Sequence, residues 1–179
     1  LGYNNEEIIF NFLSADLGLF NSIYEATLPK KTEKYPHKFL FAGRFAPEKG
    51  LDVLITAWQQ ISDKKDWQLC LVGNGPLKES LNGSNNIEIL DFMQPEHFES
   101  LIQNCGCLVL PSKKEPWALV LHEFSAAGLP IIASDTCGAN PYFLISNYNG
   151  YSFKNLESKD LAEKMQKIIL TILILPVGY

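Results

Sequence analysis

The sequence predicts an α/β fold with a Rossmann-like, doubly wound and mainly parallel sheet, and three observations support this fold class. Short apolar runs alternate with segments of helical period over about 120 residues, which is the pattern of βαβ units. No solenoid-type repeat or low-complexity tract competes with this pattern. The chain has 179 residues, of which 46% are hydrophobic and 20% charged, as is ordinary for a folded domain with a sizeable core.

The first part of the chain lacks this alternation. Ile8 to Leu13 is a short apolar run that could form a strand, whereas residues 20–34 are polar and rich in turn signals. The predicted organisation is an interdomain linker remnant over 1–35, one domain over 36–170 and a tail over 171–179. The chain begins at Leu1 without an initiator Met, which suggests a cut inside a longer protein.

From residue 38 onward, strands and helices are predicted to alternate. The predicted strands are Phe39–Ala42, Trp67–Val72, Ile87–Leu90, Cys107–Leu110, Ile131–Ala133 and Tyr151–Phe153. The predicted helices are Leu51–Ile61, a short helix after Pro76, Pro95–Asn104, a helix that starts near Leu119 and stops at Gly128, and Ser158–Leu170. The helices are predicted because apolar residues recur with a period of 3.6 and because Pro or Gly stands at several of their boundaries.

Composition excludes some partners. The net charge of −5 argues against nucleic acid, because no basic field exists to displace counterions from a polyanion. The four cysteines stand in or beside apolar runs without zinc-binding spacing, which predicts reduced core thiols in a cytosolic protein. No secretory signal opens the chain, and the apolar run 168–177 is about half the length of a membrane span.

The turn from Gly43 to Gly50 carries two cations, Arg44 and Lys49, around the predicted start of a helix. Arg offers a planar fork and Lys a compact point charge, so together they could hold a diphosphate. A solvated turn with two surface cations explains the pattern equally well. The later Gly73–Pro76 turn lacks the third glycine of the dinucleotide fingerprint, and we interpret it as one wall of a crevice.

Two acids, Glu115 and Glu123, have seven residues between them, and Pro116 prevents both from lying in one continuous helix. Glu115 is predicted in the loop beyond a strand and Glu123 about one turn into the next helix, a place where ligands bind in parallel sheets. Three interpretations stay open at this point. The acids could flank a glycosidic bond, accept hydrogen bonds from sugar and ribose hydroxyls, or have no functional role.

The histidines carry less information. His37 and His97 are predicted to be exposed, and His122, beside Glu123, is interpreted as a bystander rather than a base. No pair of histidines has the spacing of metal ligands.

Taken in order, the motifs GR(x)4KG, GxGP, PS(x)2E(x)7E, GLPIIAS and NGY resemble the carboxyl-terminal, donor-binding half of a GT-B glycosyltransferase of family GT4. The resemblance runs from about Gly2 to about Leu170. It implies a hexosyltransferase that uses a UDP- or GDP-sugar and retains the anomeric configuration. It also implies that no metal ion or other cofactor is needed, because Arg and Lys replace a divalent cation at the diphosphate.

The resemblance assigns a role to each matching residue. Glu115 would be the catalytic residue that contacts the donor sugar, and Glu123 would bind the ribose hydroxyls. Arg44 and Lys49 would hold the diphosphate, and Gly43 would belong to the donor-binding set. Backbone N–H groups from Trp117, Ala118, Leu119 and Val120 would also reach the phosphates. The backbone near Phe92 and Met93 would line the base pocket.

The sequence departs from the family pattern at three points. Ala118 stands where the family usually has Gly, so an added methyl is expected to crowd the donor or alter the backbone angle. Residues 11–13 replace an Asn-Gly step of the usual linker. The amino-terminal acceptor domain is absent, so the fragment is expected to bind donor weakly and transfer nothing on its own.

The implied partners are a nucleotide-sugar and the missing acceptor domain of the same protein, while peripheral contact with the inner membrane and a homodimer are left open. A cytoplasmic location and polysaccharide biosynthesis go with the resemblance. Two other functions also stay open: a non-catalytic Rossmann-like interaction or oligomerisation domain, motivated by Ala118 and the irregular linker, and a GT-B sugar epimerase or phosphorylase. The sequence does not identify the sugar, the base or the acceptor.

Overall fold

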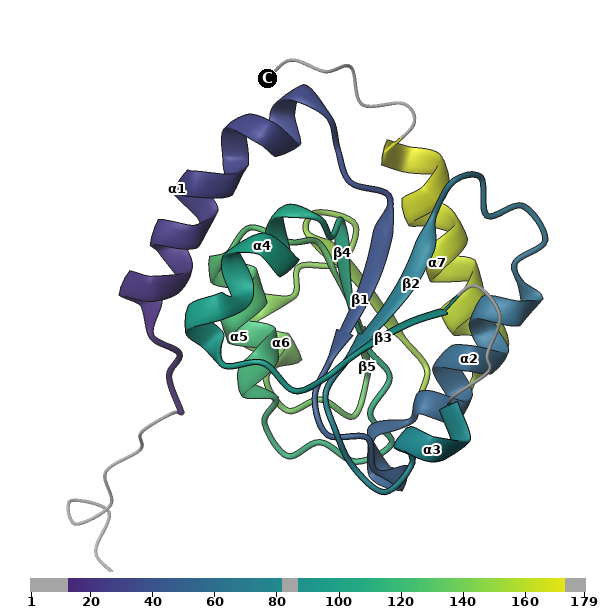
Figure 1. Cartoon of the computed structure of the whole chain (residues 1–179). Coiled ribbons are helices and arrows are strands. Elements are labelled where there is room, and N and C mark those ends of the chain that lie inside the picture. Colours follow the sequence, from purple (N-terminus) through teal and green to yellow (C-terminus); the bar gives the residue numbers. More distant parts are fainter. Residues whose placement is uncertain (1–12, 82–86, 173–179) are drawn as a thin grey trace, which may run out of the picture.

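Six parallel strands form one sheet in the computed structural model, which describes residues 13–81 and 87–172 (Figure 1). The strands are β1 (Lys38–Ala42), β2 (Gln68–Val72), β3 (Ile87–Leu90), β4 (Cys107–Leu110), β5 (Ile131–Ser134) and β6 (Gly150–Phe153). Their spatial order is β3-β2-β1-β4-β5-β6, which is the order of a doubly wound Rossmann-like sheet. The predicted fold class is therefore confirmed.

Helices cover both faces of this sheet. They are α1 (Leu17–Glu33), α2 (Leu51–Gln60), α3 (Lys78–Leu81), α4 (Phe98–Gln103), α5 (Leu119–Ala126), α6 (Asn140–Phe143) and α7 (Ser158–Ile172), with short 3-10 turns at Pro47–Lys49 and Pro95–His97. All six predicted strands and the five helices predicted after residue 38 are present. The short helix α6 was not predicted, because four residues are too few to show a helical period.

Neighbouring residues of a strand point to opposite faces and build two separate cores. In β1, Leu40 packs into a core covered by α1, α4 and α5. Phe39 and Phe41 belong to the opposite core, beneath α2 and α7. Figure 1 shows these helices on the two sides of the strands. Because both faces are covered, the central strands are buried throughout, which explains their continuous apolar runs.

Residues 17–33 correct one prediction, since this polar stretch forms helix α1 rather than a turn-rich segment. Asp16 caps the helix by accepting a hydrogen bond from the Leu19 N–H at 3.0 Å. Phe20 is buried and packs against Phe98 of α4, with ring centroids 6.3 Å apart. The helix therefore contributes to the core. The predicted strand at 8–13 lies outside the described residues apart from Leu13, which is in a loop.

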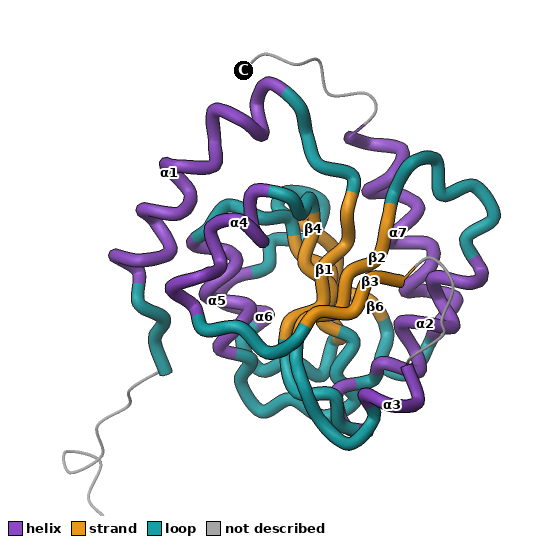
Figure 2. The backbone as a smooth tube through the Cα atoms, viewed as in Figure 1, coloured by secondary structure: helices purple, strands orange, loops and turns teal. Residues whose placement is uncertain are grey.

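The loops after the strands gather at one edge of the sheet, the lower end in Figure 2. Two glycines bring them into close contact. A Cβ atom at Gly50, where φ is 69°, would lie 2.0 Å from the Pro111 carbonyl oxygen. A Cβ atom at Gly73 would lie 1.9 Å from the Gly43 carbonyl oxygen. The turns after β1, β2 and β4 are thus packed backbone against backbone.

The last predicted helix has the expected inner face. Its buried residues include Leu161, Met165, Ile168 and Ile169, which pack beneath the sheet in the second core. None of the helices in residues 13–81 and 87–172 combines the length and the apolar character that a bilayer crossing requires.

Candidate functional site

The four charged residues singled out in the sequence come from the two segments that follow β1 and β4, three from loops or turns and Glu123 from helix α5. Arg44 and Lys49 follow β1, whereas Glu115 and Glu123 follow β4. Strands β1 and β4 are paired and parallel, and the strand order reverses between them. In doubly wound sheets this switch point opens a crevice beyond the carboxyl ends of the two strands, where ligands bind.

One cation and one acid meet directly at this edge. Lys49 Nζ lies 2.5 Å from Glu115 Oε2, and the two side chains are only 24% and 11% exposed. The hydroxyl of Ser112 donates to the same carboxylate oxygen at 3.3 Å. The backbone of Glu115 is also held, since the Gly138 N–H donates to its carbonyl oxygen at 3.1 Å. Glu115 is therefore fixed without any ligand.

A small network of polar side chains holds the loop after β4 in place. Ser112 is fully buried, and its carbonyl oxygen accepts a hydrogen bond from Thr136 Oγ1 at 2.9 Å. Thr136 Oγ1 lies 2.9 Å from the Ser134 hydroxyl at the end of β5. Asn155, after β6, donates to the Lys113 carbonyl oxygen at 3.0 Å. Our sequence reasoning missed this network; Ser112, three residues before Glu115, was the available signal.

Arg44 does not share the contact between Lys49 and Glu115. Its side chain is 67% exposed and pairs with Glu48, one turn further along. The pKa of Glu48 is lowered, first by a hydrogen bond from its own backbone N–H and then by Arg44. Because Arg44 projects into solvent, its guanidinium can turn toward a ligand at little cost.

Glu123 lies in the second turn of α5, where it is half-buried and makes no ion pair within the described part of the chain. Burial raises the pKa of its carboxyl group, because the charged form loses hydration without gaining a cation. A hydrogen-bond donor from a ligand would relieve this desolvation.

The stretch from Trp117 to Val120 begins helix α5. Ala118 has φ 79° and ψ 72°, a left-handed conformation that glycine adopts freely and alanine does not, and it is 5% exposed. Ala118 thus keeps the backbone angle suited to glycine instead of altering it, and it carries strain. The Trp117 indole N–H donates to the Leu13 carbonyl oxygen at 3.0 Å, and Leu119 is partly exposed.

The Gly73–Pro76 turn packs against the turn after β1. The Phe45 N–H donates to the Asn74 carbonyl oxygen at 2.8 Å, and the Leu77 N–H donates to the Phe45 carbonyl oxygen at 3.1 Å. Beyond it, Lys78 pairs with Asp91 in the loop that leads to Phe92 and Met93. Phe92 is 64% exposed, whereas Met93 packs against the first core.

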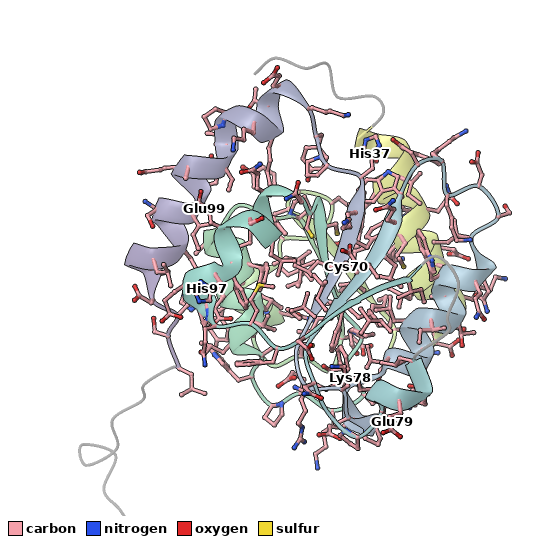
Figure 3. All side chains as sticks on the ribbon, viewed as in Figure 1. His37, Cys70, Lys78, Glu79, His97 and Glu99 are labelled. Carbon is pink, nitrogen blue, oxygen red and sulfur yellow. The ribbon has the colours of Figure 1, made fainter. Side chains whose placement is uncertain are left out.

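Two histidines are engaged in local structure. His37 is half-buried rather than exposed, lies 2.6 Å from Asp66 and stacks on Trp67. His122 Nδ1 accepts a hydrogen bond from the Ala15 N–H at 3.2 Å, and its ring stacks on Phe143. His97 is exposed, as predicted. Figure 3 shows His37 at the end of the sheet opposite to Lys78.

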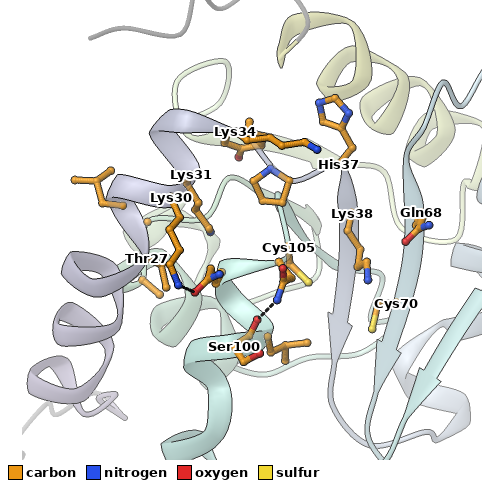
Figure 4. A pocket seen from close by; sticks show the side chains of 18 of the residues that line it. Thr27, Lys30, Lys31, Lys34, His37, Lys38, Gln68, Cys70, Ser100 and Cys105 are labelled. Carbon is orange, nitrogen blue, oxygen red and sulfur yellow. Dashed lines mark hydrogen bonds between the residues drawn. The ribbon is translucent and has the colours of Figure 1, made fainter.

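A cavity of about 1370 Å³ lies at that opposite end, between α1, α4 and the starts of β1 to β3 (Figure 4). Lys31 projects from α1 into it, and burial lowers the pKa of its amine to about 8. None of the four charged residues at the switch point lines this cavity. We place the candidate site at the switch point and not in this cavity. Charged side chains converge on packed loops at the switch point, and we give this convergence more weight than the volume of a cavity.

The cysteines are all buried free thiols, as predicted. Burial raises the pKa of Cys70, Cys105 and Cys137 to about 12 and that of Cys107 still further. Within residues 13–81 and 87–172, no group of three or more His, Cys, Asp or Glu side chains could hold a metal ion.

The fold and the loop charges define an α/β domain of Rossmann type with a candidate ligand site at its switch point. Residues 24–171 match the family model described as glycosyl transferases group 1. The chain therefore belongs to this glycosyltransferase family, and the suspected GT-B relationship is confirmed.

Individual relatives agree with the family. An uncharacterised glycosyltransferase of Methanocaldococcus jannaschii is 32% identical over 136 residues, which are 73% of this chain and 37% of that protein. The alpha-D-kanosaminyltransferase of Streptomyces kanamyceticus is 27% identical over 138 residues, or 73% of this chain and 36% of that protein. The chain thus spans little more than a third of the length of these relatives.

Solved structures share the fold. Anabaena HepE in complex with UDP-glucose superposes with a TM-score of 0.74 at 21% identity, covering 96% of this chain and 50% of that one. Sucrose-phosphate synthase from Thermosynechococcus elongatus superposes with a TM-score of 0.70 at 25% identity, covering 88% of this chain and 42% of that one.

Proposed function

We propose that this chain is the donor-binding half of a retaining GT4 glycosyltransferase that takes a sugar from a UDP- or GDP-sugar. The observation that carries the proposal is the contact between Lys49 and Glu115 at the switch point, beside the exposed Arg44. A cation that binds the diphosphate and an acid that binds the sugar hydroxyls are expected to be neighbours, because the diphosphate and the sugar are adjacent in a nucleotide-sugar. The complex of Anabaena HepE with UDP-glucose is a parallel case in the same fold.

Each of these residues would bind a different part of the donor. Arg44 and Lys49 would neutralise the diphosphate, and Glu115 would accept hydrogen bonds from the sugar hydroxyls. Glu123, half-buried and without an ion-pair partner in the described part, would accept from the ribose. The loop at 117–120 would bring backbone N–H groups to the phosphates, and the loop at 92–93 would border the base.

No metal ion or cofactor enters this scheme. The two cations would stabilise the charge that develops on the departing diphosphate, which is electrostatic catalysis by preorganised groups. Turnover would require the acceptor-binding part of a longer protein, because the relatives are more than twice as long as the matched region. The acceptor, a cytoplasmic location and contact with a membrane surface belong to that longer protein and remain part of the proposal.

Titration calorimetry with UDP and with GDP tests the proposal. Saturable binding of one nucleotide is expected, weakened at least about tenfold by Arg44→Ala or Glu123→Ala, since hydrogen bonds to charged groups contribute about 1.5–3 kcal/mol each. Lys65, in the loop before β2, and Glu99, in α4, carry the same charges outside the proposed donor contacts, so Lys65→Ala and Glu99→Ala serve as controls. Heats that are equal for wild type and the two site variants would reject the proposal. Addition of EDTA should leave the binding unchanged.

The two alternative functions give different outcomes. A non-catalytic interaction domain would bind neither nucleotide and would form a stable dimer in light scattering. An epimerase or phosphorylase would bind the nucleotide-sugar or the sugar phosphate, and a product assay on the longer protein would separate it from a transferase.

A further inference from the structure

Ser112 is a buried polar residue beside the site that none of the proposed donor contacts uses. It is the second residue after β4, its side chain is 0% exposed, and its hydroxyl donates to Glu115 Oε2 at 3.3 Å. A buried hydroxyl is stabilised by a hydrogen bond within the protein, because an unsatisfied buried group is costly. The carboxylate of Glu115 accepts this hydrogen bond from Ser112.

Ser112 is itself held in place. Its carbonyl oxygen accepts a hydrogen bond from Thr136 Oγ1 at 2.9 Å, and Thr136 is anchored by the Ser134 hydroxyl at 2.9 Å. The end of β5 therefore fixes Ser112, and Ser112 fixes the carboxylate of Glu115. This chain of contacts runs through the protein interior and needs no ligand.

Lys49 and Ser112 act on the same carboxylate oxygen. Both contact Oε2, whereas Oε1 makes no hydrogen bond to any described residue. A carboxylate held by one oxygen presents its other oxygen in a defined direction. A bound diphosphate would attract the Lys49 ammonium, because a diphosphate carries more negative charge than one carboxylate. Glu115 Oε2 would then depend on Ser112 alone.

We propose that Ser112 is a positioning residue for donor-sugar recognition: it orients Glu115 so that Oε1 meets the sugar hydroxyls once Lys49 has moved to the diphosphate. This inference rests on the proposed function. The proposed role concerns only the sugar part of the donor, because the nucleotide part makes no contact with Glu115 in the proposed arrangement. Ser112 therefore matters for binding the nucleotide-sugar and not for binding the bare nucleotide.

The first test needs no ligand. Urea unfolding is measured for wild type, Ser112→Ala, Glu115→Ala and the double variant. If Ser112 holds Glu115, the shifts in unfolding midpoint of the two single variants add up to more than the shift of the double variant. Strictly additive shifts would overturn the inference and leave the proposed nucleotide binding intact.

The second test compares ligands on the folded chain. Ser112→Ala is expected to weaken UDP-glucose about tenfold, and UDP less than about twofold. GDP-mannose and GDP replace this pair if the wild type prefers guanine. Equal losses for nucleotide and nucleotide-sugar would mean a merely structural role and would refute the inference. If the wild type binds neither nucleotide, it is the proposed function that fails.

Ser125→Ala is the matched control. The Ser125 hydroxyl is buried in α5 without a hydrogen-bond partner in the described part of the chain, so the same atom is removed and no hydrogen bond is lost. It should leave both affinities unchanged. Thr136→Val removes the hydroxyl that anchors Ser112 while keeping the side-chain shape, and it should reproduce the selective loss in weaker form.

Discussion

Lys49 and Glu115 are 66 residues apart in sequence, and their side chains meet at 2.5 Å across the switch point of the sheet. The contact joins the turn after β1 to the loop after β4, and both partners are largely withdrawn from solvent. Such a pair is less screened than a surface salt bridge, so removal of one partner leaves a charge that is hard to hydrate. Lys49 and Glu115 therefore neutralise each other in the candidate site before any ligand binds.

This pairing predicts different effects for its two members on UDP or GDP binding. Lys49→Met should weaken the nucleotide at least about tenfold, because a charged contact with phosphate is lost. Glu115→Gln should leave the affinity unchanged or increase it, because Lys49 then has no competing anion. Calorimetry on the two variants decides, and an equal loss in both would contradict the competition between carboxylate and diphosphate.

Ala118 predicts a stabilising substitution. Ala118→Gly should raise the free energy of unfolding by about 1 kcal/mol, since the left-handed conformation costs an alanine about 1–2 kcal/mol and glycine little. Ala162→Gly, in the helical conformation of α7, is the control and should lose about 1 kcal/mol. Urea unfolding measures both. A loss of stability in Ala118→Gly as large as in the control would show that the backbone there is unstrained.

The sheet could be predicted from the sequence because its strands are short apolar runs, of which β4 and β5 are buried along their whole length. The helices after residue 38 were predictable where apolar residues recur at helical spacing. Helix α1 was not, because only Phe20, Ile23 and Thr27 of its 17 residues are buried and Pro29 lies inside it. Its helical state depends on packing against α4 and α5, which no local pattern reveals.

The loops that form the candidate site could be predicted from the sequence, but the contacts between their side chains could not. Parallel strands send their carboxyl ends to one edge, so Lys49 and Glu115 had to lie near each other. That Arg44 pairs with Glu48 while Lys49 takes the acid depends on side-chain conformations at the ends of two loops. Ser112 belongs to the PS(x)2E(x)7E motif, but its role was overlooked because a serine next to a proline is an ordinary loop signal, and only the fold shows it to be buried.

Glu123 predicts a pH dependence with a definite sign. Its pKa is raised by burial above the ordinary 4.5, so the folded state binds more protons than the unfolded state just above pH 4.5. The free energy of unfolding should therefore fall as pH rises from 4.5 through the folded pKa, and Glu123→Gln should remove this decline. Urea unfolding between pH 4 and about 7 tests it. A steeper decline in the variant than in the wild type would contradict the assignment.

Lys31, in the cavity between α1 and α4, predicts an unusually reactive amine (Figure 4). Burial lowers its pKa from 10.5 to about 8, so near pH 8 about half of the Lys31 side chains are the neutral, nucleophilic amine. Because the folded state holds fewer protons than the unfolded one between about pH 8 and 10.5, this group stabilises the fold progressively as pH rises across that range. Labelling with trinitrobenzenesulfonate at pH 8, followed by peptide mapping, should modify Lys31 faster than the neighbouring Lys30, whose ammonium donates a hydrogen bond to Gln103 Oε1. Lys31→Met should raise the unfolding midpoint at pH 7 and flatten its rise toward pH 10. Slower labelling of Lys31 than of Lys30, or a lower unfolding midpoint in Lys31→Met, would contradict this prediction. Either result would mean that the Lys31 ammonium stays hydrated in the folded chain.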